Sequence, residues 1–251
     1  MKSLEGKVAI VTGGARDIGR AVSETLAARG AKVVVNYFNN EATGAETVSA
    51  IEGNGGHAIA IKGDMTTEAG VSALVNGAIE TYGSGIDIVV NNAGGLVARK
   101  ALAEMDVAFF ENVMRLNLTS TFLVSKMAVA HMSEGGSIIN LASLAGRDGG
   151  GPGAAAYATS KGAVMTFTRA LAKELGPSGI RANCICPGMI STTFHDTFTK
   201  DAVRTNVAGS TPLRREGQAQ EVADLVAYLA SSESSFVTGT SLDINGGLYF
   251  S

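Results

Sequence analysis

The chain has 251 residues, of which 45% are hydrophobic and 17% charged, and its formal net charge is −3. This composition excludes an intrinsically disordered chain, and the small negative charge gives no positive field that would attract a nucleic acid. No run in the sequence reaches the roughly 18 apolar residues of a membrane span. The two cysteines, Cys184 and Cys186, are too close in sequence for an ordinary structural disulfide and suit a reducing compartment. We therefore expect a cytoplasmic protein that binds neither membranes nor nucleic acids.

Short β-branched runs alternate along the chain with longer segments that carry apolar residues at three- and four-residue spacing. The expected strands are Val8–Val11, Lys32–Tyr37, His57–Lys62, Ile86–Val90, Ser137–Leu141, Arg181–Ile185 and Ser241–Ile244. The expected helices are Ile18–Arg29, Ala42–Glu52, Glu68–Tyr82, Phe109–His131, Ala155–Leu175 and Ala219–Ser231. Because this alternation is typical of βαβ units, we predict an α/β fold: one domain over residues 1–251, with a doubly wound, seven-stranded parallel sheet covered by helices on both faces.

The longest stretch without an expected strand covers residues 191–218. Unusually long connections in compact domains are often lids or binding loops, so we expect this stretch to cover a substrate. A passive surface connection is the alternative. The stretch could offer hydrogen bonds and positive charge to a polar or acidic substrate through Thr192, Thr193, His195, Arg204, Ser210, Thr211, Arg214 and Arg215.

A glycine-rich turn connects the first expected strand to the first expected helix, with Gly13, Gly14 and Gly19 in the sequence VAIVTGGARDIG. Bare backbone at this point would let the pyrophosphate of a dinucleotide approach the N-terminus of the helix, where free N–H groups favour anions. Many turns of this kind need glycine only for a positive φ angle. The position between a strand and a helix favours the dinucleotide site.

Tyr157 and Lys161 are four residues apart in an expected helix and therefore lie on one face of it. A free phenol has a pKa near 10 and holds its proton too tightly to act as a base at neutral pH. A neighbouring ammonium stabilises the phenolate and lowers that pKa. This pair is thus a candidate for general acid and base chemistry.

These features resemble the short-chain dehydrogenase/reductase family. The turn TGGARDIG is similar to the family's T-G-x-x-x-G-[IL]-G turn, and four further motifs extend the resemblance over essentially the whole chain: Asn91–Gly94, Asn117, Ser143 with Tyr157 and Lys161, and Pro187–Gly188. The resemblance implies a Rossmann-type fold. It also implies an NAD(P)(H)-dependent enzyme that reduces a ketone to a secondary alcohol, or runs the reverse reaction, by hydride transfer.

The resemblance also assigns roles to individual residues. It implies that Tyr157 is the general acid and base, that Ser143 holds the carbonyl oxygen, and that Asn117 holds a water connecting Lys161 to solvent. The residues it implies for cofactor binding are Gly13, Arg16, Asp17, Ile18, Gly19, Asn36, Asp64, Met65, Asn91, Ala93, Gly94, Tyr157, Lys161, Pro187, Gly188, Ile190 and Thr192.

Asp17 departs from the family pattern, which usually has a glycine at this position. A carboxylate pointing into the turn would repel a pyrophosphate, so we expect Asp17 to point outward and either cap the next helix or pair with Arg16 or Arg20. Asp64 is expected to contact the adenine, to cap the following helix, or to do both.

The cofactor is predicted to be NADP(H) rather than NAD(H). The second strand ends at Asn36-Tyr37 with no acid to accept the ribose 2′-OH, and Arg16 lies where NADP(H)-dependent members often carry a basic residue. An exposed arginine without a ligand is the alternative interpretation of Arg16.

The substrate is less defined than the reaction. The chain looks most like 3-oxoacyl-carrier-protein reductases and glucose 1-dehydrogenases of the family, and the turn variant TGG-x-RDIG favours a carbohydrate-derived keto compound such as a keto-uronate. A 3-oxoacyl-carrier-protein reductase is the alternative. A non-catalytic sensor or scaffold would be expected to lack the tyrosine or the lysine. Epimerases and dehydratases of this type are usually longer.

Two further expectations concern metals and assembly. His57, His131 and His195 are scattered without the spacing of metal ligands, so no catalytic metal is expected. The helices expected at Phe109–His131 and Ala155–Leu175 carry more apolar residues than one sheet-facing stripe needs. Because the family commonly packs these helices between subunits, we expect a homotetramer.

Overall fold

The computed structural model describes residues 3–83 and 85–250 and contains one seven-stranded parallel sheet with strand order β3-β2-β1-β4-β5-β6-β7. Its strands are β1 Val8–Val11, β2 Lys32–Tyr37, β3 His57–Lys62, β4 Ile88–Asn91, β5 Ser137–Leu141, β6 Arg181–Pro187 and β7 Ser241–Ile244. The order reverses between β1 and β4, which is where ligands bind in open sheets of this kind. The predicted fold class is confirmed.

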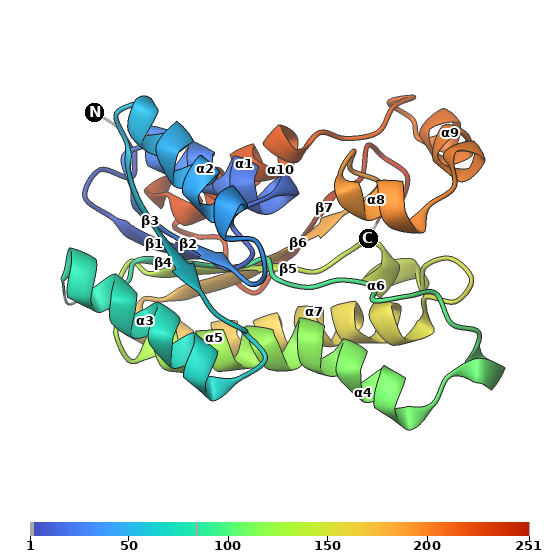
Figure 1. Cartoon of the computed structure of the whole chain (residues 1–251), viewed down its shortest axis with the longest axis horizontal. Coiled ribbons are helices and arrows are strands. Elements are labelled where there is room, and N and C mark those ends of the chain that lie inside the picture. The colour runs from blue at the N-terminus through green and yellow to red at the C-terminus, as the bar shows by residue number, and fades with distance from the viewer. Residues whose placement is uncertain (1–2, 84, 251) are drawn as a thin grey trace.

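Helices cover both faces of the sheet (Figure 1). One face carries α1 Asp17–Ala28, α2 Glu41–Gly53 and α10 Ala219–Ala230, and the other carries α3 Glu68–Tyr82, α5 Ser120–Val129 and α7 Ala155–Leu175. Successive residues of β1 point to opposite faces, so Val11 packs with α1 and α10 while Ile10 packs with α3 and α5. The carboxyl ends of the strands are thereby held rigidly between two apolar layers.

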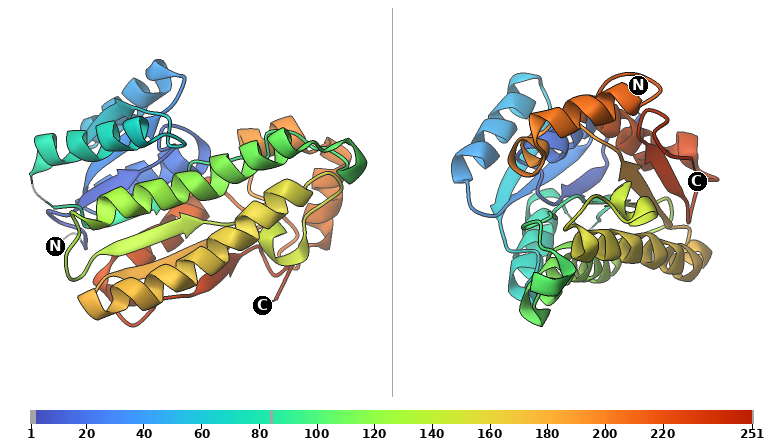
Figure 2. Two further views of the ribbon diagram at one scale, coloured as in Figure 1. Left: turned by 90° about the horizontal axis from the view of Figure 1, so that it is seen from below. Right: turned by 90° about the vertical axis from the view of Figure 1, so that its right-hand side faces the viewer.

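The long helix expected at Phe109–His131 is interrupted. It consists of α4 Val107–Met114, a π-helical turn η2 Arg115–Thr119, and α5, and it lies beside α7 (Figure 2). Asp106 starts α4 by accepting a hydrogen bond from the N–H of Phe109 at 2.7 Å. The expectation of one regular helix is therefore wrong at this turn, which brings Asn117 to the edge of the site.

The segment 191–218, called the lid segment below, is more regular than expected. It contains α8 Thr193–Phe198 and α9 Asp201–Ser210 instead of an irregular connection. In Figure 1 these helices are orange and lie at one end of the molecule, where α6 Ala145–Asp148 also lies. Short helical turns complete the chain at η1 Leu102–Glu104, η3 Gly176–Ser178 and η4 Ser232–Ser234.

None of the helices within residues 3–83 and 85–250 has the length and hydropathy that a membrane span requires. The same residues contain no group of three His, Cys, Asp or Glu side chains placed to hold a metal ion. Cys184 and Cys186 are both fully buried on β6 as free thiols, in a small cluster with Val164 and Met165.

Candidate active site

The glycine-rich turn packs too tightly against its neighbours to accept a side chain. A Cβ on Gly19 would overlap the carbonyl oxygen of Gly13 and would lie 2.7 Å from Nδ2 of Asn92. Gly13 has a φ angle of +59°, a conformation that favours glycine. The hydroxyl of Thr12 accepts hydrogen bonds from the N–H groups of Asn92 and Ala93, each at 3.0 Å, which joins the turn to the end of β4. The result is a bare backbone cradle at the start of α1, and it fits the pyrophosphate of a dinucleotide.

A cavity of about 1050 Å³ extends from this turn to Tyr157 and the lid segment. It brings together nearly all the residues that sequence analysis proposed. Those that line it are Gly13, Arg16, Asp17, Ile18, Gly19, Asn36, Asp64, Met65, Ala93, Gly94, Ser143, Tyr157, Lys161, Pro187, Gly188, Ile190 and Thr192. Asn91 and Asn117 do not line the cavity.

Asn91 points into the core, contrary to its expected place at the cofactor. Its Nδ2 donates to Oδ1 of Asn140 at 2.8 Å and to the hydroxyl of Ser125 at 3.0 Å. The reason is that β4 continues through Asn91, whose register partner on β5 is Asn140. Asn92, the next residue, lines the cavity instead and donates to the carbonyl oxygens of Thr12 and Gly13 at 3.1 Å. Sequence alone could not assign the two adjacent asparagines to the two sides.

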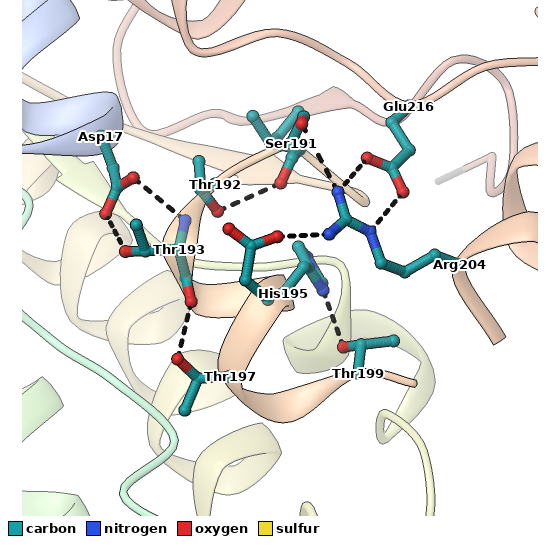
Figure 3. A network of polar contacts seen from close by, with 11 residues as sticks. Asp17, Ser191, Thr192, Thr193, His195, Thr197, Thr199, Arg204 and Glu216 are labelled. Atoms are coloured by element: carbon teal, nitrogen blue, oxygen red, sulfur yellow. Dashed lines mark hydrogen bonds and ion pairs between the residues drawn. The ribbon is translucent and has the colours of Figure 1, made fainter. Parts of the chain in front are cut away.

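Asp17 neither caps α1 nor pairs with Arg20. Its carboxylate accepts hydrogen bonds from the N–H of Thr193 at 3.1 Å and from the Thr193 hydroxyl at 2.5 Å, so it ties the turn to the lid segment (Figure 3). The expected pairing with Arg16 is present as a long contact, with Nε 4.0 Å from this carboxylate, whereas Arg20 pairs with Glu24. Asp17 has a φ angle of +49°, which non-glycine residues seldom adopt. The strained conformation directs the carboxylate toward α8.

Asn36, on β2, braces the end of the cavity next to the glycine-rich turn. Its Oδ1 accepts from the N–H of Gly13 at 3.1 Å and its Nδ2 donates to the carbonyl oxygen of Gly63 at 3.1 Å. Arg16, by contrast, extends a side chain that is 75% exposed beside the cavity.

Asp64 organises the loop after β3 instead of capping a helix. One of its oxygens accepts from the N–H of Thr66 at 2.9 Å and from the Thr66 hydroxyl at 2.7 Å. The cap of α3 is Thr67, whose hydroxyl accepts from the N–H of Gly70. The helix-capping alternative for Asp64 is therefore wrong, and its carboxylate lines the cavity.

Tyr157 and Lys161 share one face of α7 as predicted. The Lys161 ammonium lies 5.8 Å from the centroid of the Tyr157 ring and donates to the carbonyl oxygen of Leu141 at 2.6 Å. Ser143 follows β5, and its hydroxyl accepts from the N–H of Ala145 at 3.1 Å. Three groups that can donate protons or hydrogen bonds thus converge on one part of the cavity.

Burial shifts the pKa values of both residues on α7. It raises the pKa of Tyr157, and hydrogen bonding with Ser143 acts in the opposite direction. It lowers the pKa of Lys161 to about 8, although the thiols of Cys184 and Cys186 oppose that change. The expected lowering of this pKa by the Lys161 ammonium is not seen, because burial is the largest influence on the phenol and only Ser143 opposes it. At neutral pH Tyr157 is therefore protonated and able to donate.

Asn117 lies in η2, where its side chain holds the loop after β4. Its Oδ1 accepts from the N–H of Gly95 at 3.0 Å, and its Nδ2 donates to the carbonyl oxygens of Gly95 and Val113, both at 2.9 Å. A Cβ on Gly94 would lie 2.5 Å from Oδ1 of Asn117 and 3.2 Å from Nζ of Lys161. Both Asn117 and Lys161 thus reach the side of Gly94 where a side chain would stand, so this position requires glycine. Such π turns occur frequently at functional sites.

The lid segment is held together by polar contacts (Figure 3). Arg204 on α9 binds both oxygens of Glu216 at 2.7 Å and also pairs with Asp196 on α8. The Nδ1 of His195 contacts the hydroxyl of Thr199 at 2.9 Å. Sequence analysis did not identify the aromatic side chains of α8, Phe194 and Phe198, although their spacing of one helical turn was a signal for them.

Comparison with known proteins agrees with this geometry. A family model described as enoyl-(acyl carrier protein) reductase matches residues 13–249. Glucose 1-dehydrogenase 2 of Bacillus subtilis is 36% identical over 250 residues, which cover 98% of this chain and 96% of that protein.

Two solved structures are similar over their whole lengths. The crystal structure of a blue fluorescent protein from a metagenomic library, in complex with NADPH, is 37% identical with a TM-score of 0.92 and covers 99% of this chain and 100% of its own. An NADH-dependent reductase responsible for alginate metabolism is 33% identical with a TM-score of 0.91 and covers 100% of both chains. Together with the turn and the residues on α7, these matches confirm the resemblance: the chain belongs to the short-chain dehydrogenase/reductase family and is an oxidoreductase of that family.

Proposed function

We propose that this enzyme reduces ketones to secondary alcohols, or oxidises such alcohols, with NADP(H), and that Tyr157 is the general acid and base. The observation that carries the proposal is the convergence of Ser143, Tyr157 and Lys161 on a cavity that begins at a bare phosphate-binding turn. This arrangement places a proton donor and a second hydrogen-bond donor at the end of a dinucleotide site.

The turn at Gly13 and Gly19 would hold the dinucleotide, which in its reduced form would supply the hydride for the carbonyl carbon. As the carbonyl π electrons move to the oxygen, Tyr157 donates its phenolic proton to that oxygen and a hydroxyl group forms. Ser143 donates a hydrogen bond to the same oxygen and fixes its position. Lys161, with a pKa of about 8, can exchange protons at neutral pH and lies beside Tyr157 on α7, so it can restore the proton of Tyr157 after each turnover.

Replacement of the phenol tests this mechanism. Tyr157→Phe removes the donated proton, so we expect kcat to fall by ~10²–10⁴-fold while NADPH still binds. The measurement is the loss of NADPH absorbance on a panel of ketones, with cofactor binding followed by fluorescence. Near wild-type turnover by the variant would contradict the role of Tyr157. A wild-type protein that binds NADPH and turns over no ketone or alcohol would favour the sensor or scaffold alternative.

The preference for NADP(H) over NAD(H) rests on Arg16. Its exposed guanidinium lines the adenosine end of the cavity and can form charge-assisted hydrogen bonds with a 2′-phosphate. One similar structure contains NADPH and another similar protein is NADH-dependent. Arg16→Ala should raise KM for NADPH and leave KM for NADH almost unchanged. Equal effects on the two cofactors would show that Arg16 does not contact the phosphate.

We also propose a cytoplasmic homotetramer. The free, buried thiols of Cys184 and Cys186 support a reducing compartment. Phe122 on α5 is 43% exposed and packs edge-on against Phe167 of α7, so the two helices share an apolar outer surface. Light scattering at micromolar concentration should give four times the chain mass, and a monomeric mass would contradict the assembly.

A further inference from the structure

The part of the cavity near Tyr157 is bounded by aromatic rings from the lid segment. Phe194 lies with its ring centroid 5.9 Å from that of Tyr157, 5.2 Å from that of Phe198 and 5.1 Å from that of His195. These separations are typical of packed aromatic pairs. We call Tyr157, Phe194, His195 and Phe198 the aromatic wall. All four line the cavity, and the phenol of Tyr157 is the expected proton donor.

An apolar side chain on the loop after β4 also lines the cavity, and its backbone is strained. Val97, in the loop after β4, has a φ angle of +65° and is 40% exposed while lining the cavity. A β-branched residue is a genuine outlier in this conformation, and such strain is concentrated at ligand sites. Val207 of α9 and Leu248 near the C-terminus line the same cavity. Apolar side chains from three separate segments thus supplement the aromatic wall.

The arginines of the lid segment are bound to other groups of the protein and do not face the cavity at this wall. Arg204 forms ion pairs with Glu216 and Asp196, and Arg215 forms an ion pair with Glu221. Arg214 donates to the carbonyl oxygen of Gly209. None of the three arginines lines the cavity. The sequence-based expectation that they would meet an acidic substrate is therefore not supported by their positions.

One further cation lies at the wall: Arg99 donates to the carbonyl oxygens of Phe198 at 3.1 Å and Pro152 at 2.9 Å, and it does not line the cavity. Burial, and then the neighbouring Arg204, lower the pKa of His195, so its imidazole is neutral at physiological pH. Asp148 lines the cavity with a carboxylate that accepts from the N–H of Gly150 at 2.8 Å. The cations that do line the cavity belong to other elements: Arg16 at the start of α1, Arg115 in η2, where it donates to Asn112, and Lys161 on α7. A substrate carboxylate at the aromatic wall would lose its hydration without gaining a cation from α8 or α9.

We propose, on the basis of the ketone reductase function above, that the substrates are uncharged ketones with an aromatic or alicyclic ring next to the carbonyl group. The ring packs against Phe194 and Phe198 while the carbonyl oxygen reaches Tyr157 and Ser143. His195 adds a neutral hydrogen-bonding group at the edge of the ring. Keto-uronates carry a carboxylate and therefore fall outside this class.

A matched pair of substrates tests the charge preference. Methyl 4-acetylbenzoate and 4-acetylbenzoate have the same aryl ketone and differ in one ester or carboxylate group. With NADPH at pH 7, we expect kcat/KM to be at least tenfold higher for the ester. An equal value, a preference for the carboxylate, or faster reduction of a keto-uronate would overturn the substrate class and leave the ketone reductase function standing. Failure to turn over any ketone or secondary alcohol would overturn both proposals.

Variants of the aromatic wall test the contact with the ring. Phe194→Leu and Phe198→Leu should each raise KM for the ester several-fold, and by a larger factor than they lower kcat, because the loss is in ring packing. Phe236→Leu is the control, since Phe236 is fully exposed and does not line the cavity. Phe198→Arg should shift the ratio of kcat/KM values toward 4-acetylbenzoate by tenfold or more. An unchanged KM in both leucine variants, with an unchanged ratio in Phe198→Arg, would show that the wall does not contact the substrate.

Discussion

The floor of the cavity and the lid segment line the same space but are held in place by different interactions. On the floor, Lys161 is 5% exposed and donates to the carbonyl oxygen of Leu141 at the end of β5. Asn117, which lies behind the floor and does not line the cavity, is 0% exposed and donates to the backbone of α4. In the lid segment, neither α8 nor α9 contains a buried residue. The floor is therefore fixed by the packing of the whole domain, whereas the lid segment depends on a few polar contacts and can open locally at low cost.

The two regions meet at Asp17. This residue belongs to the phosphate-binding turn, yet its carboxylate binds the first residue of α8. A pyrophosphate bound at the turn would add negative charge close to that carboxylate. The hydrogen bonds from Thr193 would then stabilise the carboxylate more strongly. Cofactor binding and lid position are thus expected to be coupled through one side chain, although 176 residues separate the pair in sequence.

The largest expected effect concerns a charge buried in the floor. Burial lowers the pKa of Lys161 from 10.5 to about 8, so above pH 8 the folded protein loses this proton while the unfolded chain keeps it until about pH 10.5. Raising the pH across that window therefore stabilises the folded state, by up to ~1.4 kcal/mol per pH unit. Below pH 8 both states are protonated and the cost of burying the ammonium is fully present.

Comparison of the wild type with Lys161→Met isolates this effect, because other titrating groups are common to both proteins. From pH 8 to 9.5, the unfolding free energy of the wild type should rise relative to that of the variant by about 1.6 kcal/mol. Urea unfolding at the two pH values measures the difference. A difference that does not change with pH would mean that the ammonium is well solvated in the folded protein.

The sheet and the main site residues were predictable because their signals are local. β1 and β2 were predicted to the residue, since short apolar runs bounded by Gly and polar residues define them. The spacing of Tyr157 and Lys161 likewise fixed their shared helical face.

The errors arise where tertiary contacts decide the structure. The π turn at Asn117 depends on hydrogen bonds to Gly95, 22 residues away, and leaves the apolar spacing of the helix almost unchanged. The partner of Asp17 and the aromatic wall depend on how the lid segment folds back over the turn, which no local pattern encodes.

The smaller expected effect is confined to the lid segment. We propose that this segment closes over the cavity when cofactor and substrate bind, as water must be excluded from the site of hydride transfer. Arg204 joins α9 to both Asp196 and Glu216, so Arg204→Ala removes contacts that hold the two helices together. In the protein without ligands, amide hydrogen exchange across residues 193–210 should become roughly tenfold faster, with little change in Tm.

Arg215→Ala provides the matched control for this prediction. Arg215 also lies in the lid segment, but it pairs with Glu221 at the start of α10, and both side chains are largely exposed. Exposed pairs of this kind contribute little, so exchange across residues 193–210 should stay within about twofold of the wild type. Adding NADPH and a ketone should slow exchange of the segment in the wild type, and less so in Arg204→Ala. Unchanged exchange on ligand binding in both proteins would mean that the segment is a passive connection and that the floor alone selects the substrate.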